Sequence, residues 1–577
     1  MAAGLAISIP DKEVSAWVAE TTPKETRAWL ATLPLADSAE AAREIYQSLY
    51  TLNRLELGAQ ERLKLMELYH KPVATVTDAL LHHFARAVLP LTPRKRQLAE
   101  FIRQLHLEMA NGYKCVVHDA YHSRMLWGRK KMLAAAVEAA MRYLDEVLQQ
   151  SYQIYIPCPS GVWTELHELY RFAEHYGWFV DHSAGAAKTG GDKPPIYHLY
   201  LEIVLLGLCN PYQLPQGECR RIDQFLERWA GEAMIHRELD VANPVGHFLI
   251  DLSKDAPPVP YPRDVSLQPV SHLRALNAVL LASTVQGFIN RLKKGESTRM
   301  LDLGTECLDS ACLDMLRRMI RFWGLAARRQ RSRVKRRGYY FVASGINAVH
   351  FFSSGQKPFA PPGQATQTTP DKKASLPDKI DTDSPNASAE RAFVDLGDQD
   401  AIEETAVSGK RLAEPLLRAR EVYRVDRWQI RDESVGGMLL ATVGSHGSYV
   451  RVGELIGIQD PASPAQWRVG VVRWMRAPDE QTTEMGVAML APTVIPVALK
   501  AAVPGANDRP YSQGLLLPSV EVLRQPASLI VPRGSLQQPD TWLLSAGEAP
   551  LRRVKALEVL EQTGSFERIV FADAAGV

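Results

Sequence analysis

The sequence predicts a multidomain protein with a large all-α N-terminal domain, a second domain that is an all-β barrel or sandwich, and a small C-terminal β-rich module. Helical periodicity dominates residues 1–325, whereas short strand-like runs separated by Gly, Asp and Pro follow over 326–500 and 501–577. At about 150 residues per domain, 577 residues correspond to three or four domains. The two changes of pattern favour three.

The N-terminal domain is predicted from apolar residues at helical spacing, as between residues 45 and 57. Residues 130–153 are rich in good helix formers and contain neither Gly nor Pro, which predicts a long helix. Pro72 predicts a break between two helices. The most apolar run, 197–209, is too short to cross a bilayer and predicts a buried helix.

The all-β domain begins after a basic run and is interrupted by a polar segment. Residues 328–337 contain seven Lys or Arg residues, and a stretch with strand formers and turn glycines follows them. Residues 356–407 are rich in Pro, Thr, Ser, Asp and Lys and have few large apolar side chains, which predicts a disordered linker. Strand-like runs return over 424–500, and further ones fill the C-terminal module.

Composition excludes several classes of protein. Hydrophobic residues make up 46% of the chain and charged residues 23%, which excludes a wholly disordered chain and a collagen-like fibre. The net charge is only +2, and because the basic run is so concentrated, the remainder of the chain is mildly acidic. Six cysteines without a CxxC pair predict reduced, mostly buried thiols and a cytoplasmic protein. The sequence predicts neither a signal peptide nor a membrane span.

One residue pattern in the all-β domain is suited to binding a ligand. Asp432, Ser434 and Gly437 follow the spacing D-x-S-x-x-G, and Arg329 and Arg333 follow the spacing R-x-x-x-R ahead of a predicted strand. A D-x-S-x-x-G segment alone is typical of many hairpins. Combined with the upstream arginines and the following strands, these residues resemble the PilZ domain family over about a quarter of the chain.

The resemblance implies a six-stranded β-barrel that binds the bacterial second messenger cyclic di-GMP. Arg329 and Arg333 would clamp the phosphates and stack on guanine, because a guanidinium makes paired hydrogen bonds to phosphate and has a flat face. Asp432 would accept from a guanine edge. Ser434 and Gly437 would shape the turn and let the backbone approach the ligand.

Two other arginine pairs have the same spacing, namely Arg333 with Arg337 and Arg420 with Arg424. The pair Arg329 and Arg333 is preferred because a doubled arginine, three residues and then Arg-Val is the usual form of the family, and a strand follows. The Arg420 pair would leave no room for a first barrel strand before Asp432. The long separation of Arg333 from Asp432 is explained if the linker is a surface insertion between two strands.

The resemblance thus implies a bacterial cyclic di-GMP receptor that couples ligand binding to a protein partner through the helical domain, with motility, pili or biofilm as output. The alternative is a helical scaffold or adaptor whose PilZ-like module is degenerate and binds no nucleotide. A nucleic-acid binder that uses residues 328–337 is a third, disfavoured hypothesis.

No enzyme, metal site or cofactor is predicted. The sequence contains no phosphate loop, no G-x-G-x-x-G and no G-x-S-x-G segment, and no catalytic residues are assigned. His118 and His122 have the i, i+4 spacing of a zinc pair, but neither a metalloprotease glutamate nor a third ligand accompanies them. Cyclic di-GMP is the only small-molecule ligand that we expect.

Overall fold

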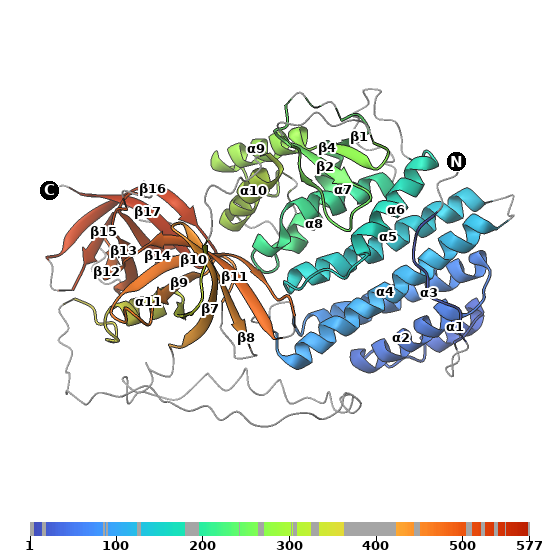
Figure 1. Ribbon diagram of the computed structural model, residues 1–577, viewed down its shortest axis with the longest axis horizontal. Helices are drawn as coiled ribbons and strands as arrows, with labels where there is room; N and C mark the ends of the chain where they lie inside the picture. Colours follow the sequence, from blue (N-terminus) through green and yellow to red (C-terminus); the bar gives the residue numbers. More distant parts are fainter. Residues whose placement is uncertain are drawn as a thin grey trace.

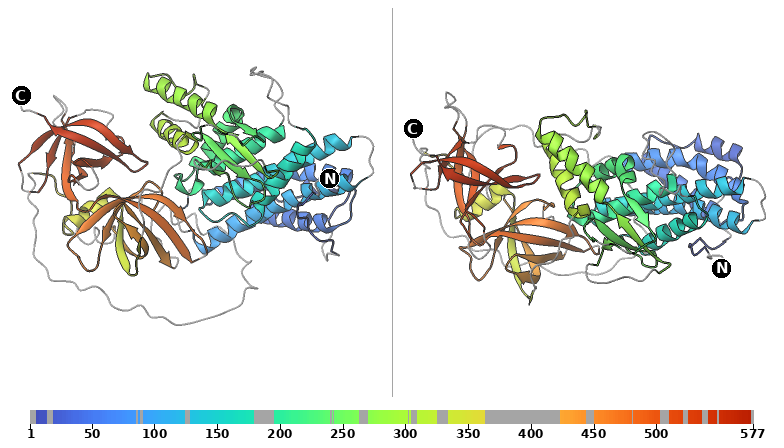
Figure 2. Two further views of the ribbon diagram at one scale, coloured as in Figure 1. Left: turned by 45° about the horizontal axis from the view of Figure 1, so that its top comes forward. Right: turned by 90° about the horizontal axis from the view of Figure 1, so that it is seen from above.

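The helices α1 to α8 lie at one end of an elongated molecule, and two β-barrels lie at the other end (Figures 1 and 2). The predicted fold class, with a helical region followed by a six-stranded barrel and a small β module, is confirmed. The exact domain boundaries at 325/326 and 500/501 stay predictions. The computed structural model describes residues 5–13, 19–84, 87, 91–123, 128–178, 195–239, 241, 243–262, 270–301, 303, 309–324, 334–362, 423–443, 450–479, 481–502, 510–520, 525–535, 541–547 and 550–574.

Three of the N-terminal helices begin at polar caps. Thr22, Asp37 and Thr92 each accept the backbone N–H of the residue three positions on, which satisfies a free donor of the first turn. The described helices are α1 (Pro23–Leu30), α2 (Ser38–Arg54), α3 (Ala59–Leu81), α4 (Pro93–His122), α5 (Arg129–Gln153), α6 (Val162–His175), α7 (Pro195–Leu208), η1 (Pro211–Gln213), α8 (Glu218–Trp229), η2 (Ala230–Glu232), α9 (Val279–Lys293), α10 (Asp309–Gly324) and α11 (Ile346–Ser353).

Three expectations for this region have clear outcomes. The long helix over 130–153 and the buried helix near 197–209 are confirmed as α5 and α7. The predicted break at Pro72 is wrong, because α3 runs through that residue. Val73 and Val76 are fully buried where α3 packs on α4, and this tertiary burial outweighs the hydrogen bond that proline cannot donate.

The helical region also contains a small antiparallel sheet that the sequence did not predict. Its strands have two to five residues, which is too short for a recognisable alternation of apolar and polar side chains. They are β1 (Met234–His236), β2 (His247–Asp251), β3 (Val259–Pro260) and β4 (Leu273–Asn277), in the order β1-β4-β2-β3.

The thiol prediction holds only in part. Cys115, Cys158, Cys209 and Cys219 are free, and all but Cys158 are fully buried. Cys312 is disulfide-bonded, so the expectation of reduced thiols is wrong for that residue. The absence of a CxxC motif excludes a disulfide at that one spacing only, so it could not exclude a disulfide at Cys312. No described helix combines the length and apolar character needed to cross a membrane.

The first barrel is closed by antiparallel pairing in the order β7-β6-β9-β10-β11-β8, with β8 returning to β7. The short β5 pairs with β7 just beyond β6, so that β5 and β6 together flank one side of β7. The strands are β5 (Val334–Lys335), β6 (Tyr339–Ser344), β7 (Val425–Ser434), β8 (Gly437–Val443), β9 (Leu455–Gln459), β10 (Trp467–Arg476) and β11 (Thr482–Ala491).

Residues 363–407 of the predicted linker lie outside the described residues. They belong to the connection that joins β6 and α11 to β7, and β6 and β7 are neighbours in the barrel. Most of the residues between Arg333 and Asp432 therefore belong to a long connection between two adjacent strands, as expected for an insertion between them.

The C-terminal module is a second closed barrel, in the order β12-β13-β14-β17-β16-β15. Helix α11 lies between the two barrels, where Val349 shares one apolar cluster with Leu455 of the first barrel and Phe566 of the second. The two barrels therefore share this apolar cluster, in addition to the separate core of each. The strands are β12 (Ile495–Ala501), β13 (Ser512–Leu517), β14 (Ser528–Pro532), β15 (Thr541–Ser545), β16 (Arg552–Gln562) and β17 (Phe566–Asp573).

The helical region enters the first barrel through Tyr155, which follows α5. Its side chain belongs to the apolar core of the barrel, and its backbone has a φ of 57°, a left-handed conformation that is uncommon for a tyrosine. The Tyr155 hydroxyl donates to Leu214 O at 2.6 Å, and the backbone N–H of Ala477 donates to Tyr155 O at 2.7 Å. Tyr155 thus connects the α5 end to both the η1 region and the β10–β11 turn.

His106 on α4 is a buried imidazole that couples stability to pH. Its ring centroid lies 6.1 Å from that of Tyr143, and its Nδ1 has no hydrogen-bond partner among the described residues. Burial lowers the pKa of His106 from 6.5 to about 4. Because the unfolded chain gains a proton near the ordinary value, unfolding is favoured progressively as the pH falls through this range.

Replacing His106 by leucine should remove this coupling. We expect the loss of unfolding free energy between pH 7 and pH 4 to be smaller by about 3 kcal/mol in His106→Leu than in the unchanged chain. Chemical denaturation at several pH values measures the difference. The exposed His83 provides the control His83→Leu, which should keep the original pH dependence. Identical slopes for all three chains would contradict a neutral buried His106.

Candidate ligand site in the β7–β8 hairpin

The three motif residues of the barrel lie together at the turn that joins β7 to β8. Asp432 and Ser434 end β7, and Gly437 begins β8 opposite Ser434. Ser434 Oγ donates to Gly437 O at 3.1 Å, which ties the two ends of the turn together. The hairpin thus brings Asp432, Ser434 and Gly437 into one short segment.

A β-bulge decides which way these side chains face. Ile430 and Asp432 of β7 lie opposite consecutive residues of β8, which makes Arg431 an extra residue. Before the bulge, Ile430 contributes to the barrel core. After it, Glu433 lies opposite Met438, a fully buried core residue. Because successive side chains alternate across a strand, Glu433 faces inward, whereas Asp432 and Ser434 face outward.

Close packing between two strands requires a glycine at position 437. A Cβ atom at this position would lie 2.3 Å from the carbonyl oxygen of Val487 on β11. That oxygen belongs to the backbone of a paired strand and cannot move aside easily. The glycine of the motif therefore permits the close approach of β8 to β11, whatever else it contributes.

The arginine candidates are only partly described. Arg329, Arg333 and Arg420 lie outside the described residues. Val334, the residue after Arg333, lies opposite Glu433, and Lys335 lies opposite Asp432. The chain that follows the preferred arginine pair therefore enters the barrel beside the motif.

The remaining arginines have different places. Arg424 directly precedes β7, at the end opposite Asp432, and the length of the strand separates the two by roughly 25 Å. Arg337 is exposed between β5 and β6, near the motif end of the barrel. Arg337 thus remains compatible in position with a site around Asp432, whereas Arg424 does not reach it.

Sequence reasoning missed Glu433, which gathers three donors. Glu433 Oε1 accepts from Arg468 Nη1 at 2.8 Å, and Oε2 accepts from the Tyr340 hydroxyl at 3.1 Å and from Arg336. Burial alone would raise the pKa of Glu433, but the hydrogen bonds from Arg468 and Arg336 outweigh it and lower the pKa. No sequence signal locates the bulge that turns Glu433 inward.

The described residues hold no group of three His, Cys, Asp or Glu side chains that could bind a metal ion. His122 Nδ1 donates to the His118 carbonyl at 2.9 Å, and His118 Nδ1 lies 3.2 Å from the Asp119 carboxylate. Both histidine side chains therefore contact other residues of α4.

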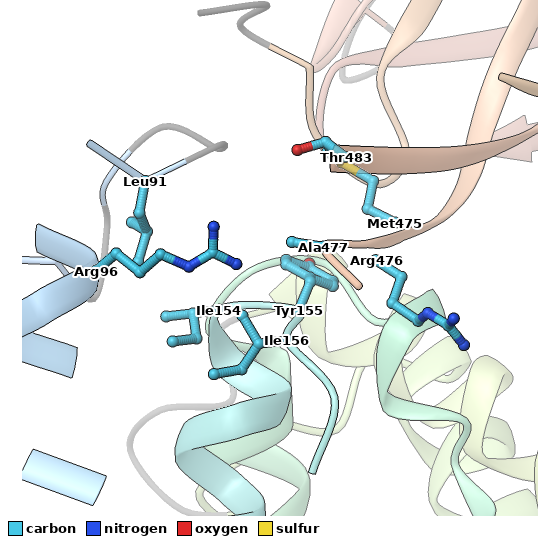
Figure 3. A pocket seen from close by; sticks show the side chains of 9 residues that line it. All are labelled: Leu91, Arg96, Ile154, Tyr155, Ile156, Met475, Arg476, Ala477 and Thr483. Carbon is cyan, nitrogen blue, oxygen red and sulfur yellow. The ribbon is translucent and has the colours of Figure 1, made fainter. Parts of the chain in front are cut away.

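A pocket between the helical region and the barrel lies away from the motif (Figure 3). At this end β11 begins with Thr482 opposite Val443, whereas Gly437 lies opposite Ala488, about 20 Å farther along the strand. Arg96 Nη2 spans the junction and donates to Asp479 O at 2.7 Å. The pocket is lined by Leu91, Arg96, Ile154, Tyr155, Ile156, Met475, Arg476, Ala477 and Thr483.

A closed six-stranded barrel with D-x-S-x-x-G in its β7–β8 hairpin, entered from a basic segment, defines a PilZ-type barrel protein. Comparison with known proteins agrees. Residues 24–240, 247–496 and 497–574 match three family models, described as the N-terminal domain of cyclic-di-GMP receptor FimW, its middle PilZ domain and the FimW C-terminal β-barrel domain. The chain therefore belongs to the PilZ domain family, in the three-domain form of FimW.

A curated relative covers nearly the whole chain. Cyclic-di-GMP receptor FimW of Pseudomonas aeruginosa strain PAO1 is 29% identical over 571 residues, which span 97% of this chain and 91% of the relative. No solved structure matches. None of the three matching family models describes an enzyme.

The close approach at Gly437 predicts that Gly437→Ala weakens the barrel. Because the added methyl would meet the backbone of β11, we expect a loss of about 1–3 kcal/mol in unfolding free energy, measured by urea denaturation. Gly564→Ala is the control, since a Cβ there has nothing within 4 Å. Equal urea midpoints for the two variants would show that β8 and β11 are less tightly apposed than described.

Proposed function

We propose that the chain is a cyclic di-GMP receptor whose ligand binds at the β7–β8 hairpin together with the arginine segment that precedes β5. The observation that carries the proposal is the pairing of β5 with the motif end of β7. Lys335 lies opposite Asp432, only two residues after Arg333 in the chain. The name of the relative, a cyclic-di-GMP receptor, supports the same ligand.

The proposed contacts follow from the chemistry of the ligand. Arg329 and Arg333 bind phosphate oxygens through paired, charge-assisted hydrogen bonds and stack on guanine. Asp432, on the outer face, accepts from the donor edge of a guanine. Ser434 and Gly437 keep the turn in shape, and the Ser434–Gly437 hydrogen bond supports this role.

The proposed output passes through the helical region to a protein partner. Residues 325–333 connect α10 to β5 in the chain, so ligand binding by the arginines of this segment would also change how α10 is tethered to the barrel. Motility, pili or biofilm formation are the outputs that we infer, in a cytoplasmic protein.

Titration of the purified full-length chain with cyclic di-GMP tests the proposal. We expect micromolar or tighter binding by calorimetry, lost in Arg329→Ala and in Arg333→Ala, because each removes a bidentate phosphate contact. Asp432→Ala should weaken binding by about 1–3 kcal/mol, the range for a bidentate base-edge contact. Arg424→Ala, at the far end of β7, is the matched control and should bind like the unchanged chain.

Other outcomes would redirect the assignment. No binding at high ligand concentration would refute the receptor proposal and favour an adaptor with a degenerate PilZ module. Loss of binding in Arg337→Ala but not in Arg329→Ala would move the phosphate contact to Arg333 and Arg337. Nucleic-acid binding with a steep salt dependence would instead assign residues 328–337 to a polyanion.

A further inference from the structure

The mouth of the first barrel at the motif end is filled by an ion-paired cluster instead of apolar side chains. Tyr340 of β6, Glu433 of β7 and Arg468 of β10 meet there, and Arg336 joins from the segment between β5 and β6. The Arg468 guanidinium lies 4.6 Å from the centroid of the Tyr340 ring, close enough for a cation–π contact. Three strands are therefore connected through one carboxylate.

The cluster faces the interior of the barrel. Arg468 lies opposite Ile458, and Tyr340 lies opposite Trp428, and both of these partners are core residues. Glu433 and Arg468 are largely buried, with 17% and 23% of their side-chain surface exposed. A carboxylate and a guanidinium in such a place are stable only while they stay paired, because removing one leaves the other desolvated and alone.

Two registers are possible for the end of β7, one with a bulge at Arg431 and one without, and Glu433 faces inward only in the bulged register. Strict alternation from Ile430 would place the side chain of Asp432 inside the barrel and that of Glu433 outside. Backbone hydrogen bonds from Arg336 N to Arg431 O, at 3.3 Å, and from Ile430 N to Gly338 O, at 3.1 Å, flank the bulge. The hydrogen bonds that Glu433 accepts from Tyr340, Arg468 and Arg336 form only when it faces inward, so they favour the bulged register.

We propose that Glu433 is a positioning residue: its ion pairs inside the barrel mouth fix the bulged register of β7 and thereby keep Asp432 and Ser434 on the outer face, where cyclic di-GMP is read. The inference rests on the proposed function for its ligand. Glu433 itself makes no contact with the ligand, since it faces the opposite side of the strand from Asp432.

A thiol reporter tests the register without any ligand. Asp432→Cys places a thiol on the outer face, and we compare its rate of maleimide labelling in the otherwise unchanged chain and in a Glu433→Gln background. We expect labelling at least about tenfold slower with Glu433→Gln, since an inward thiol reacts only on local opening. The same chains without the reporter give the background from Cys158, the half-buried free thiol.

Ligand affinity is measured in parallel on chains that retain Asp432. Glu433→Gln should weaken cyclic di-GMP binding about tenfold, equivalent to about 1.4 kcal/mol. The control is Glu561→Gln, which breaks an ion pair between β16 of the second barrel and Arg473 on β10 of the first, and should change neither affinity nor labelling. If Glu433→Gln fails to fold, Arg468→Gln removes the same ion pair from its other side and carries the same expectations.

The outcomes separate the two proposals. Weaker binding with an unchanged labelling rate would overturn the positioning role and make Glu433 a direct ligand contact. An unchanged affinity together with an unchanged labelling rate would also overturn the positioning role. If the unchanged chain binds no cyclic di-GMP, the proposed function fails, whereas slowed labelling in Glu433→Gln would still establish that Glu433 fixes the register.

Discussion

The pairing of β7 with β8 is the constraint on which the first barrel depends, because this pairing closes the sheet. The same hairpin carries the D-x-S-x-x-G motif, so barrel closure and the proposed ligand recognition depend on the same residues. Gly437 illustrates the overlap, since it lies against the backbone of β11 while belonging to the D-x-S-x-x-G turn. The shape of the candidate site is thus set by barrel closure and not by a loop that varies independently.

The barrel has different neighbours at its two ends. The motif end holds charged side chains around Glu433, whereas at the other end Tyr155 of the helical region completes an apolar core. Two routes therefore connect the hairpin with the helices: packing through the barrel core to Tyr155, and the chain segment 325–333 that leads from α10 to β5. Ion pairs stabilise the motif end of the barrel, and apolar packing joins its other end to the helical region.

The sequence predicted the features that depend on local pattern. Helical spacing located α5, and the D-x-S-x-x-G spacing located a hairpin whose turn has the expected serine and glycine. Features that depend on tertiary context were missed. The continuity of α3 through Pro72 depends on burial against α4, and the inward turn of Glu433 depends on an extra residue that leaves no trace in the spacing. The arginine contacts stay predictions, because Arg329 and Arg333 lie outside the described residues.

The connection between β6 and β7 has a consequence for the order of folding. These strands are neighbours in the barrel, yet β6 ends at Ser344 and β7 begins only at Val425. During synthesis the helices and β6 leave the ribosome well before the strand that β6 must pair with. Contacts of such long sequence separation form slowly, so α1 to α10 have time to fold before the barrel closes. The two barrel neighbours of β6, namely β7 and β9, both follow it in the chain, so both edges of β6 stay unpaired until they are synthesised, and β6 is open to intermolecular pairing in the nascent chain.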